Sequence, residues 1–458
     1  GDPADETIVT LESPGPLVKA NQVDTDVTIG EQFTYTITVP ATPVDTPLYD
    51  VRILDDLSAS STDISFVSAN VVSGGSWSLS NTGTSSSVII EDTATGIDIP
   101  AGGQAVIEIT VEMLNTTTNQ SGVLFSNTAS YTYNRANGNS STQTTGESAT
   151  TGNMAVVEPD IASVTKTASN PTPTAGETIR YSVTLTASGG AGTSDVFDVT
   201  LTDSLDLGLA YAGNPTVTVG PGVSADNTIG APDIIGDGAT TAQTLVWDIN
   251  SDVPSDIDIE AGTSVTIEYD VQVLDNVLAN QALDNSVVAQ WTSLDDQSAA
   301  ERDGSDGIGL LNDYITAAVT ETVTTQDVTA TIAKVRSSDT YGNTDTDVRI
   351  GDIVEYTLTI SMQEGTLGNL QLIDTLPQGL EFAGVVSING NTGPSPYTAV
   401  APFSHDDILD TDIVESGDPA TAPTTVSWNI RTLTNQPDDG ADDNFTIVYP
   451  VSYTHLRA

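Results

Sequence analysis

Residues 32–39, with the sequence QFTYTITV, decide the fold. Apolar side chains stand at every second position from Phe33 to Val39, and polar residues, mostly threonine, fill the positions between them. Because side chains of a strand point alternately to its two faces, this pattern predicts a β-strand with one buried and one wet face. The pattern returns as TIRYSVTL at 178–185 and as IVEYTLTI at 353–360, each time shortly after a glycine. The chain therefore contains a threefold repeat.

Further strand-like segments surround this alternating strand in each repeat. A segment with a lysine precedes it, and an aspartate–leucine segment follows it. In the first two repeats a glycine turn then leads to a second alternating strand, and a segment with an asparagine closes the unit. In the first repeat these are LVKA at 17–20, DVRILDDL at 50–57, IPAGGQAVIEITVEM at 99–113 and FSNTASY at 125–131. No stretch has a useful 3.6-residue period, so the chain is predicted to be all-β, with tandem immunoglobulin-like β-sandwich domains in an elongated array.

The connecting segments predict the domain boundaries. Residues 1–13 are interpreted as a connector from a preceding domain, because DETIVTLESPG parallels the MAVVEPD that leads into the second repeat. The first repeat is assigned to residues 14–157, the second to 158–326 and the third to 327–458. The last seven residues, SYTHLRA at 452–458, are interpreted as translated sequencing adapter, which would make the third repeat a truncated one.

Composition excludes several classes of function. The chain has 458 residues, with 63 acidic residues against 11 lysines and arginines and a formal net charge of −52. Nucleic acid is excluded as a partner because it would be repelled. The longest apolar runs are too short to span a bilayer. There is no cysteine, so the domains must be held by core packing, metal or another cross-link. Loops rich in Thr, Ser, Gly, Asn and Asp indicate an extracellular protein, at the cell surface or secreted.

The three lysines of the chain stand at the same place in each repeat. Strand parity puts each lysine on the core-facing side, Lys166 beside Ala162 and Lys334 beside Ile332. The same argument turns one aspartate and one asparagine of each complete repeat toward the core. The residues are Lys19, Asp55 and Asn127 in the first repeat, Lys166, Asp203 and Asn285 in the second, and Lys334 and Asp374 in the third. An amine, a carboxyl and a carboxamide are thus predicted to converge inside the first two repeats.

Burial would change the chemistry of these groups. Desolvation lowers the pKa of a lysine and raises the pKa of an aspartate. A neutral amine is a nucleophile, and a protonated aspartic acid polarises an amide carbonyl and transfers protons as general acid and base. Such a trio is predicted to form a Lys–Asn isopeptide bond with loss of ammonia, once in each domain. An ordinary buried Lys–Asp ion pair is the alternative.

The order of these motifs resembles that of the isopeptide-forming immunoglobulin-like repeats of bacterial fimbriae and adhesins. It is equally similar to a widespread repeat domain of unknown function on bacterial and archaeal surface proteins. The resemblance covers nearly the whole chain. It implies cross-links between Lys19 and Asn127 and between Lys166 and Asn285, with Asp55 and Asp203 as the catalytic acids. In the third repeat Lys334 and Asp374 match the pattern, with Asp374 as the acid, whereas the spacing puts the asparagine beyond residue 458.

These observations predict a structural stalk or spacer segment of an extracellular surface protein or adhesin. It would be no enzyme beyond single-turnover self-cross-linking, and its partner would be an unknown surface or matrix ligand. An accessory region of a large secreted hydrolase is the alternative. No cofactor or metal site is predicted, but acidic clusters without EF-hand spacing offer oxygen ligands to calcium. These clusters are Asp24/Asp26, Asp345/Asp347, Asp406–Asp412 and Asp438–Asp443.

Overall fold

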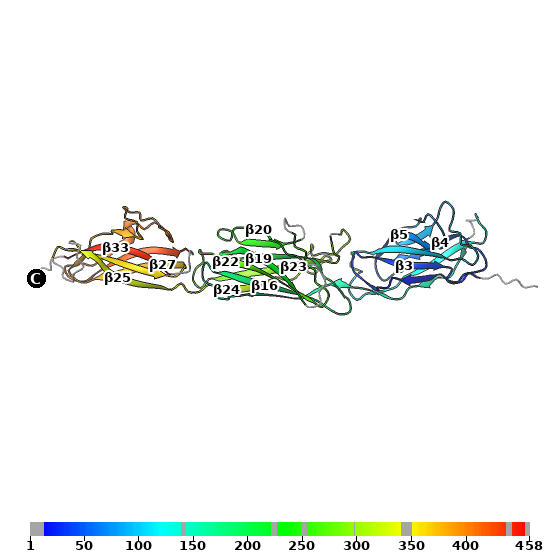
Figure 1. Ribbon diagram of the computed structural model, residues 1–458, viewed down its shortest axis with the longest axis horizontal. Coiled ribbons are helices and arrows are strands. Elements are labelled where there is room, and N and C mark those ends of the chain that lie inside the picture. Colours follow the sequence, from blue (N-terminus) through cyan, green and yellow to red (C-terminus); the bar gives the residue numbers. More distant parts are fainter. Residues whose placement is uncertain are drawn as a thin grey trace, which may run out of the picture.

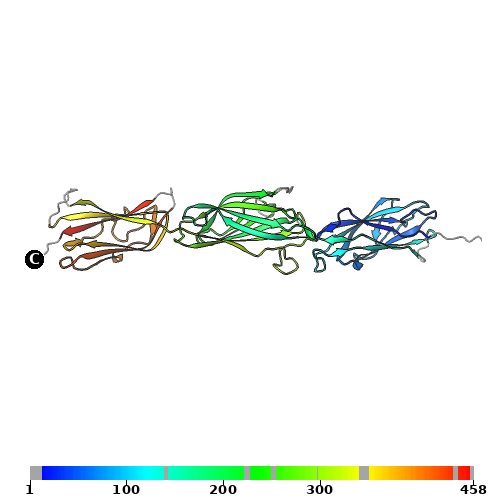
Figure 2. The same cartoon turned by 90° about the horizontal axis from the view of Figure 1, so that it is seen from below.

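The computed structural model describes residues 13–138, 143–220, 227–248, 254–296, 298–339, 350–436 and 442–453. Within these ranges the chain consists of β-strands and two short 3-10 helices, Leu57–Ala59 and Asp410–Asp412, and it contains no α-helix. Three β-sandwich domains lie end to end in both views of the molecule (Figure 1, Figure 2). The predicted fold class, an elongated array of all-β sandwich domains, is confirmed.

The first domain packs a four-stranded sheet against a larger one. The alternating strand of the sequence is β3 (Gln32–Val39), and all four of its apolar side chains are buried. The first sheet has the order β1 (Val18–Asn21), β3, β8 (Ala105–Met113) and β5 (Ile64–Ser73). The second has the order β11 (Thr144–Thr145), β10 (Thr128–Asn134), β4 (Tyr49–Asp56), β7 (Ser87–Glu91) and β6 (Ser80–Asn81), and β12 (Ala149–Thr150) also pairs with β10.

The second domain repeats this arrangement. Its first sheet has the order β15 (Ile161–Ala168), β16 (Thr178–Ala187), β22 (Ser264–Val273) and β19 (Leu209–Val219). Its second sheet has the order β20 (Asp233–Ile235), β21 (Gln243–Trp247), β18 (Phe197–Leu205), β23 (Ala282–Thr292) and β24 (Val319–Thr324). The lysine strand therefore forms the edge of one sheet in both domains, and the aspartate strand lies between two neighbours in the other sheet.

The third domain has the same first sheet and a shorter second one. The first has the order β25 (Ala330–Asp339), β26 (Ile353–Met362), β33 (Asp443–Tyr453) and β28 (Leu380–Phe382), with β29 (Ser387–Ile388) also on β33. The second has the order β27 (Gly365–Leu376), β32 (Thr424–Asn435) and β30 (Phe403–His405), with β31 (Ile413–Ser416) also on β32. Among the residues placed in the structure, no strand takes the position of β10 or β23 beside β27.

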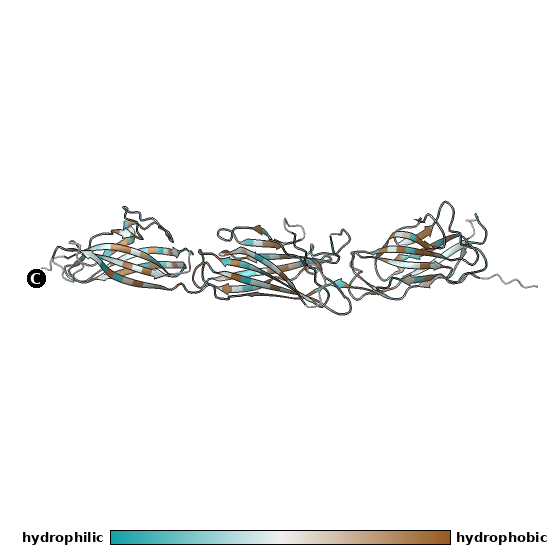
Figure 3. Cartoon of the chain, viewed as in Figure 1, coloured by the Kyte–Doolittle hydropathy of each residue, from teal (hydrophilic) through white to brown (hydrophobic). Residues whose placement is uncertain are grey.

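Each domain has its own hydrophobic core between its two sheets. Apolar and polar residues alternate along the strands in all three domains (Figure 3). Trp247 and Trp428, on equivalent strands, are both fully buried. Since burial of a Val, Leu, Ile, Phe or Met side chain stabilises a fold by roughly 1.5–3 kcal/mol, these cores hold the domains in a chain that has no cysteine.

The first junction is formed by two short sheets and one buried arginine. One sheet combines β2 (Asp26–Val27), β13 (Met154–Val156) and β9 (Leu124–Phe125), and the other pairs β14 (Glu158–Pro159) with β17 (Thr193–Ser194). Arg302, from the loop after β23, is 1% exposed. Its guanidinium donates to Asn115 Oδ1 at 3.0 Å, to Glu158 Oε2 at 2.7 Å and to the carbonyl oxygens of Thr116 and Asn119. The second domain is thus locked to a loop of the first.

Parts of the sequence interpretation lie outside the described residues. These parts are residues 1–12 of the predicted connector and residues 454–458 of the predicted adapter. Ser452 and Tyr453 close strand β33. The described residues contain no helix with the length and hydrophobicity that a membrane span needs.

Candidate functional site

The lysine, aspartate and asparagine of the second repeat meet inside the second domain. Lys166 lies on β15, Asp203 on β18 and Asn285 on β23, so the side chains come from both sheets. Lys166 Nζ lies 2.6 Å from Asn285 Oδ1 and also donates to Asp203 Oδ2. The side chains of Lys166 and Asp203 have no exposed surface, and Asn285 is fully buried. Amine, acid and amide are therefore in direct contact away from solvent.

A tyrosine that the sequence analysis did not single out completes this cluster. Tyr269, on β22, donates its hydroxyl proton to Asp203 Oδ2 at 2.5 Å and accepts a hydrogen bond from Asn285 Nδ2 at 3.2 Å. Its hydroxyl therefore holds both the acid and the amide. The sequence held one sign of its position, because strand parity puts Tyr269 on the core-facing side of an alternating strand. In the structure it pairs in register with Tyr181.

The equivalent position differs between the domains. In the third domain it holds Tyr449, which pairs with Tyr356 and donates its hydroxyl proton to Asp374. In the first domain it holds Ile109, which pairs with Tyr35. The hydroxyl is therefore a feature of the second and third domains only.

Burial shifts the pKa values of the buried amines and of one acid. Desolvation lowers the pKa of Lys166 to about 8, although the Asp203 carboxylate opposes this shift. Desolvation likewise raises the pKa of Asp203, against the effect of the lysine. Both pKa shifts favour a neutral Lys166 amine beside a protonated Asp203 carboxyl. The pKa of Lys19 in the first domain is lowered to about 8 by the same cause.

In the first domain the acid stands between the amine and the amide. Lys19 Nζ donates to Asp55 Oδ2 at 2.6 Å, and Asn127 Nδ2 donates to Asp55 Oδ1 at 2.8 Å. The side chains of Lys19 and Asp55 have no exposed surface. Lys19 Nζ lies 4.2 Å from the centre of the Tyr35 ring. The buried Asn127 Oδ1 has no hydrogen-bond partner in the described residues, so the carbonyl is unengaged.

The third domain brings together the amine and the acid alone. Lys334 Nζ lies 2.8 and 2.7 Å from the two carboxylate oxygens of Asp374. The prediction that Lys334 is buried is wrong, because its side chain is 33% exposed and Ile332 on the same face is 58% exposed. In the other domains β12 and β24 lie against the lysine strand, and the described part of the third domain has no such strand. Among the described residues, no asparagine hydrogen-bonds to Lys334 or Asp374.

Parity otherwise placed the site residues on the correct face. The aspartates and asparagines of the first two domains are all buried, as are the apolar residues two positions away on their strands, among them Ile53, Leu201 and Val287. One neighbour of Lys166 is an exception, since Ala162 is exposed and Ile161 is buried instead. A bulge between Ile161 and Ser163 causes this difference, because one extra residue reverses the face of what precedes it.

The predicted calcium clusters form no compact group of three acids where the structure describes them. Asp345 and Asp347 lie outside the described residues, as do Asp438 and Asp439 of the cluster at 438–443. In the described part, the group whose ligand atoms all lie within 4.8 Å of one another consists of Asp198, Asp258 and Asp295. No sequence motif links these three residues.

Comparison with known proteins finds distant structural neighbours. No family model and no curated protein matches the chain. It is similar to the C-terminal domain of the AgI/II polypeptide BspA of Streptococcus agalactiae, at 9% identity and TM-score 0.28, over 68% of this chain and 99% of that one. It is similar to the C-terminal domain of the Streptococcus pyogenes antigen I/II-family protein AspA, at 10% identity and TM-score 0.28, over 69% and 100%.

A pilin is a further neighbour. Domains D2 and D3 of the major pilin SpaD from Corynebacterium diphtheriae match at 12% identity and TM-score 0.22, over 62% of this chain and 81% of that one. At these identities and TM-scores the comparisons transfer no function to this chain.

Proposed function

We propose that the chain is a structural stalk or spacer segment of an extracellular surface protein, and that its first two domains cross-link themselves through Lys–Asn isopeptide bonds. The observation that carries this proposal is the contact of Lys166, Asp203 and Asn285 in the solvent-free interior of the second domain. The end-to-end arrangement of the sandwiches suits a spacer (Figure 1).

An ordinary ion pair explains less of this arrangement. A buried Lys–Asp pair is costly to desolvate, and apolar residues of similar volume often replace it without loss of stability. Such a pair needs no carboxamide, yet both domains bury an asparagine in contact with the amine or the acid. The lowered lysine pKa values, about 8 in each domain, favour the nucleophilic form of the amine.

The reaction in the second domain is an amide exchange that needs no outside reagent. The neutral Nζ of Lys166 attacks Cγ of Asn285, while the acid form of Asp203 hydrogen-bonds the amide and stabilises the tetrahedral adduct. Asp203 gives its proton to Nδ2 and takes one from Nζ, so it ends the reaction in the acid form in which it began. The Cγ–Nδ2 bond breaks, ammonia leaves, and the Nζ–Cγ amide remains. Each site reacts once, so the protein is not an enzyme in the ordinary sense.

Intact mass spectrometry of the full chain tests this proposal. Each bond removes one ammonia, about 17 Da by the stoichiometry of amide formation, so two bonds lower the mass by about 34 Da. Lys19→Ala and Lys166→Ala should each restore one ammonia, and Lys334→Ala should restore none, which makes it the matched control. A wild-type mass equal to the sequence mass would leave the two domains as spacers without cross-links.

A further inference from the structure

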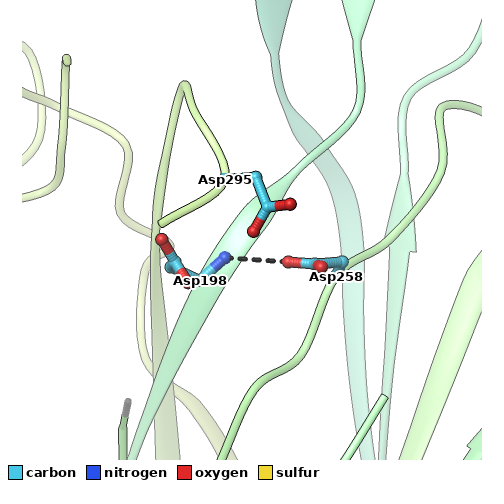
Figure 4. A group of neighbouring side chains, drawn as sticks. All are labelled: Asp198, Asp258 and Asp295. Atoms are coloured by element: carbon cyan, nitrogen blue, oxygen red, sulfur yellow. Dashed lines mark hydrogen bonds between the residues drawn. The ribbon is translucent and has the colours of Figure 1, made fainter. Parts of the chain in front are cut away.

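We propose that the second domain binds a calcium ion between Asp198, Asp258 and Asp295, at the end that contacts the first domain. Asp198 lies at the start of β18, Asp258 precedes β22, and Asp295 lies in the loop after β23. Figure 4 shows the three side chains as neighbours, with the backbone N–H of Asp198 donating to the Asp258 carboxylate. One carboxylate oxygen from each residue lies within 4.8 Å of the other two, so a single ion between them can reach all three.

Asp198 supplies an independent sign of a missing positive partner. The residue is only 8% exposed, and its Oδ1 atom has no hydrogen-bond partner in the described part of the chain. Its Oδ2 atom has a single long contact, 3.5 Å from Thr292 Oγ1. A buried carboxylate oxygen without a donor is unfavourable, and a cation would satisfy the free Oδ1 atom.

The first domain has the same backbone arrangement. Asp50 takes the place of Asp198, and Asp98 takes the place of Asp258. Asp50 and Asp198 both have positive φ angles, 47° and 48°. The backbone N–H of Asp50 donates to Asp98 Oδ1 at 3.0 Å, and that of Asp198 donates to Asp258 Oδ1 at 3.1 Å. The two sites therefore share this backbone arrangement and differ in the side chains that contact the two aspartates.

In the first domain, amide groups donate hydrogen bonds to both carboxylates. Asp50 Oδ2 accepts from Asn134 Nδ2 at 2.9 Å and from the Gly138 N–H at 3.2 Å. Asp98 Oδ2 accepts from Asn137 Nδ2 at 3.0 Å. The second domain presents Asp295 to the same pair of carboxylates and thereby adds a third negative charge.

This third charge makes the site of the second domain unfavourable without a cation. Carboxylate oxygens are ligands for hard cations. Calcium accepts six to eight oxygens in flexible geometry and completes its shell with water. The half-buried Asp258 and the exposed Asp295 leave the site open to solvent on one side, which admits the ion and its waters.

Binding of the ion would also act on the domain junction. Asp295 follows Ser293, whose hydroxyl donates to the Ile29 carbonyl oxygen of the first domain at 2.8 Å. The backbone N–H of Arg302, the buried arginine of the junction, donates to the same Ser293 hydroxyl at 2.9 Å. Calcium would tie this loop to the body of the second domain and thereby stiffen the joint.

Calorimetric titration of the full chain, freed of metal by a chelator, tests the site. We expect calcium to bind and to raise the melting temperature of the second domain, because a ligand of the folded state stabilises it. Asp295→Asn should weaken this binding by more than about tenfold, as loss of a charged ligand does. Asp45→Asn, an exposed change of equal charge in the first domain, should leave it unchanged.

Other outcomes would overturn the proposal. The proposal fails if the wild type and Asp295→Asn bind calcium equally. It also fails if calcium does not change the melting temperature. An equal response to magnesium would overturn the assignment to calcium. Asp295 is exposed, so its substitution should not prevent folding, and circular dichroism of the variant checks this independently of any cross-link.

Discussion

Replacement of the buried ion pair by apolar residues distinguishes the cross-link from a salt bridge by the sign of its effect. The variant Lys166→Met/Asp203→Leu removes the nucleophile and the acid together and leaves no unpaired charge in the core. The Tyr269 hydroxyl and the Asn285 amide, already in contact at 3.2 Å, can satisfy each other once the acid is gone. The double substitution therefore removes the proposed isopeptide bond without leaving an unpaired charge in the core.

The two hypotheses predict opposite changes in stability. Lys166 and Asn285 are 119 positions apart, and closing a loop of that length restricts the unfolded chain by about 5 kcal/mol in the loop-entropy model. If the bond forms, its loss lowers the melting temperature of the second domain by roughly 10–20 °C, at about 2–4 °C per kcal/mol for a domain of this size. If only an ion pair exists, apolar replacement is neutral or stabilises the domain by about 1–4 kcal/mol.

Differential scanning calorimetry of the full chain is the assay, with the mass of each sample recorded in parallel. The transition of the first domain, which keeps Lys19 and Asn127, serves as the internal reference. We expect a wild-type mass that includes the loss of ammonia and a lower transition in the variant. A wild type that has lost ammonia at Lys166, together with a variant that melts at the same or a higher temperature, would refute the loop-entropy argument.

Further predictions concern single residues. Tyr269→Phe should slow the mass loss of the second domain without affecting the first, where the position is isoleucine; equal rates in a time course would deny the tyrosine a positioning role. The variant Asn285→Ala cannot cross-link, and the denaturant midpoint of its second domain should rise as the pH goes from about 8 toward 10.5. In this range the unfolded chain holds the Lys166 proton that the folded domain has lost, so stability increases with pH. A flat or falling profile would contradict the lowered pKa of Lys166. Lys334→Ala should cost no more than about 1 kcal/mol in thermal unfolding, since that lysine is partly exposed, and a loss like that of a buried pair would contradict this. Arg302→Gln should loosen the first junction by about 2–5 kcal/mol and broaden the distance distribution in small-angle scattering; an unchanged distribution would contradict it.

The period-two pattern and the repeat predicted most of the fold and the burial of most candidate cross-link residues. A buried strand allows only one register of apolar residues, so the alternation around Phe33 and Tyr181 fixed which face points inward. The same rule placed Asp203 and Asn285 toward the core from sequence alone. It failed at Ala162, where a bulge adds a residue, because a bulge leaves no clear mark in a short polar segment.

Contacts between distant segments were beyond the reach of this reasoning. Tyr269 pointed inward by parity, but only the packing of the two sheets shows that its hydroxyl reaches Asp203. Asp198, Asp258 and Asp295 are separated by 60 and 37 positions, and no local motif links them. Arg302 resembles any exposed arginine in a polar loop until the first domain is placed against it. Tertiary proximity, and not local pattern, creates these sites.

The proposed bond also determines which part of the second domain would carry tension. A pull along the array enters near Glu158 and reaches Lys166, from which a covalent bond would pass it directly to Asn285. The chain between those two residues, which includes Asp198 and Asp258, would then bear no load. The 41 residues after Asn285, up to Gln326, would still bear it, and they could extend by at most about 140 Å.

The load-bearing segment between Asn285 and Gln326 contains Asp295 and Arg302. Arg302 binds Glu158 at the start of the second domain and the loop at 115–119 of the first domain. A calcium ion at Asp295 would fasten this load-bearing segment to Asp198, inside the segment that the bond shields. Single-molecule pulling should therefore show an extension of up to about 140 Å for the cross-linked second domain, at a force that falls on chelation in the wild type and not in Asp295→Asn. An extension near the full contour length of the domain would mean that the load does not pass from Lys166 to Asn285.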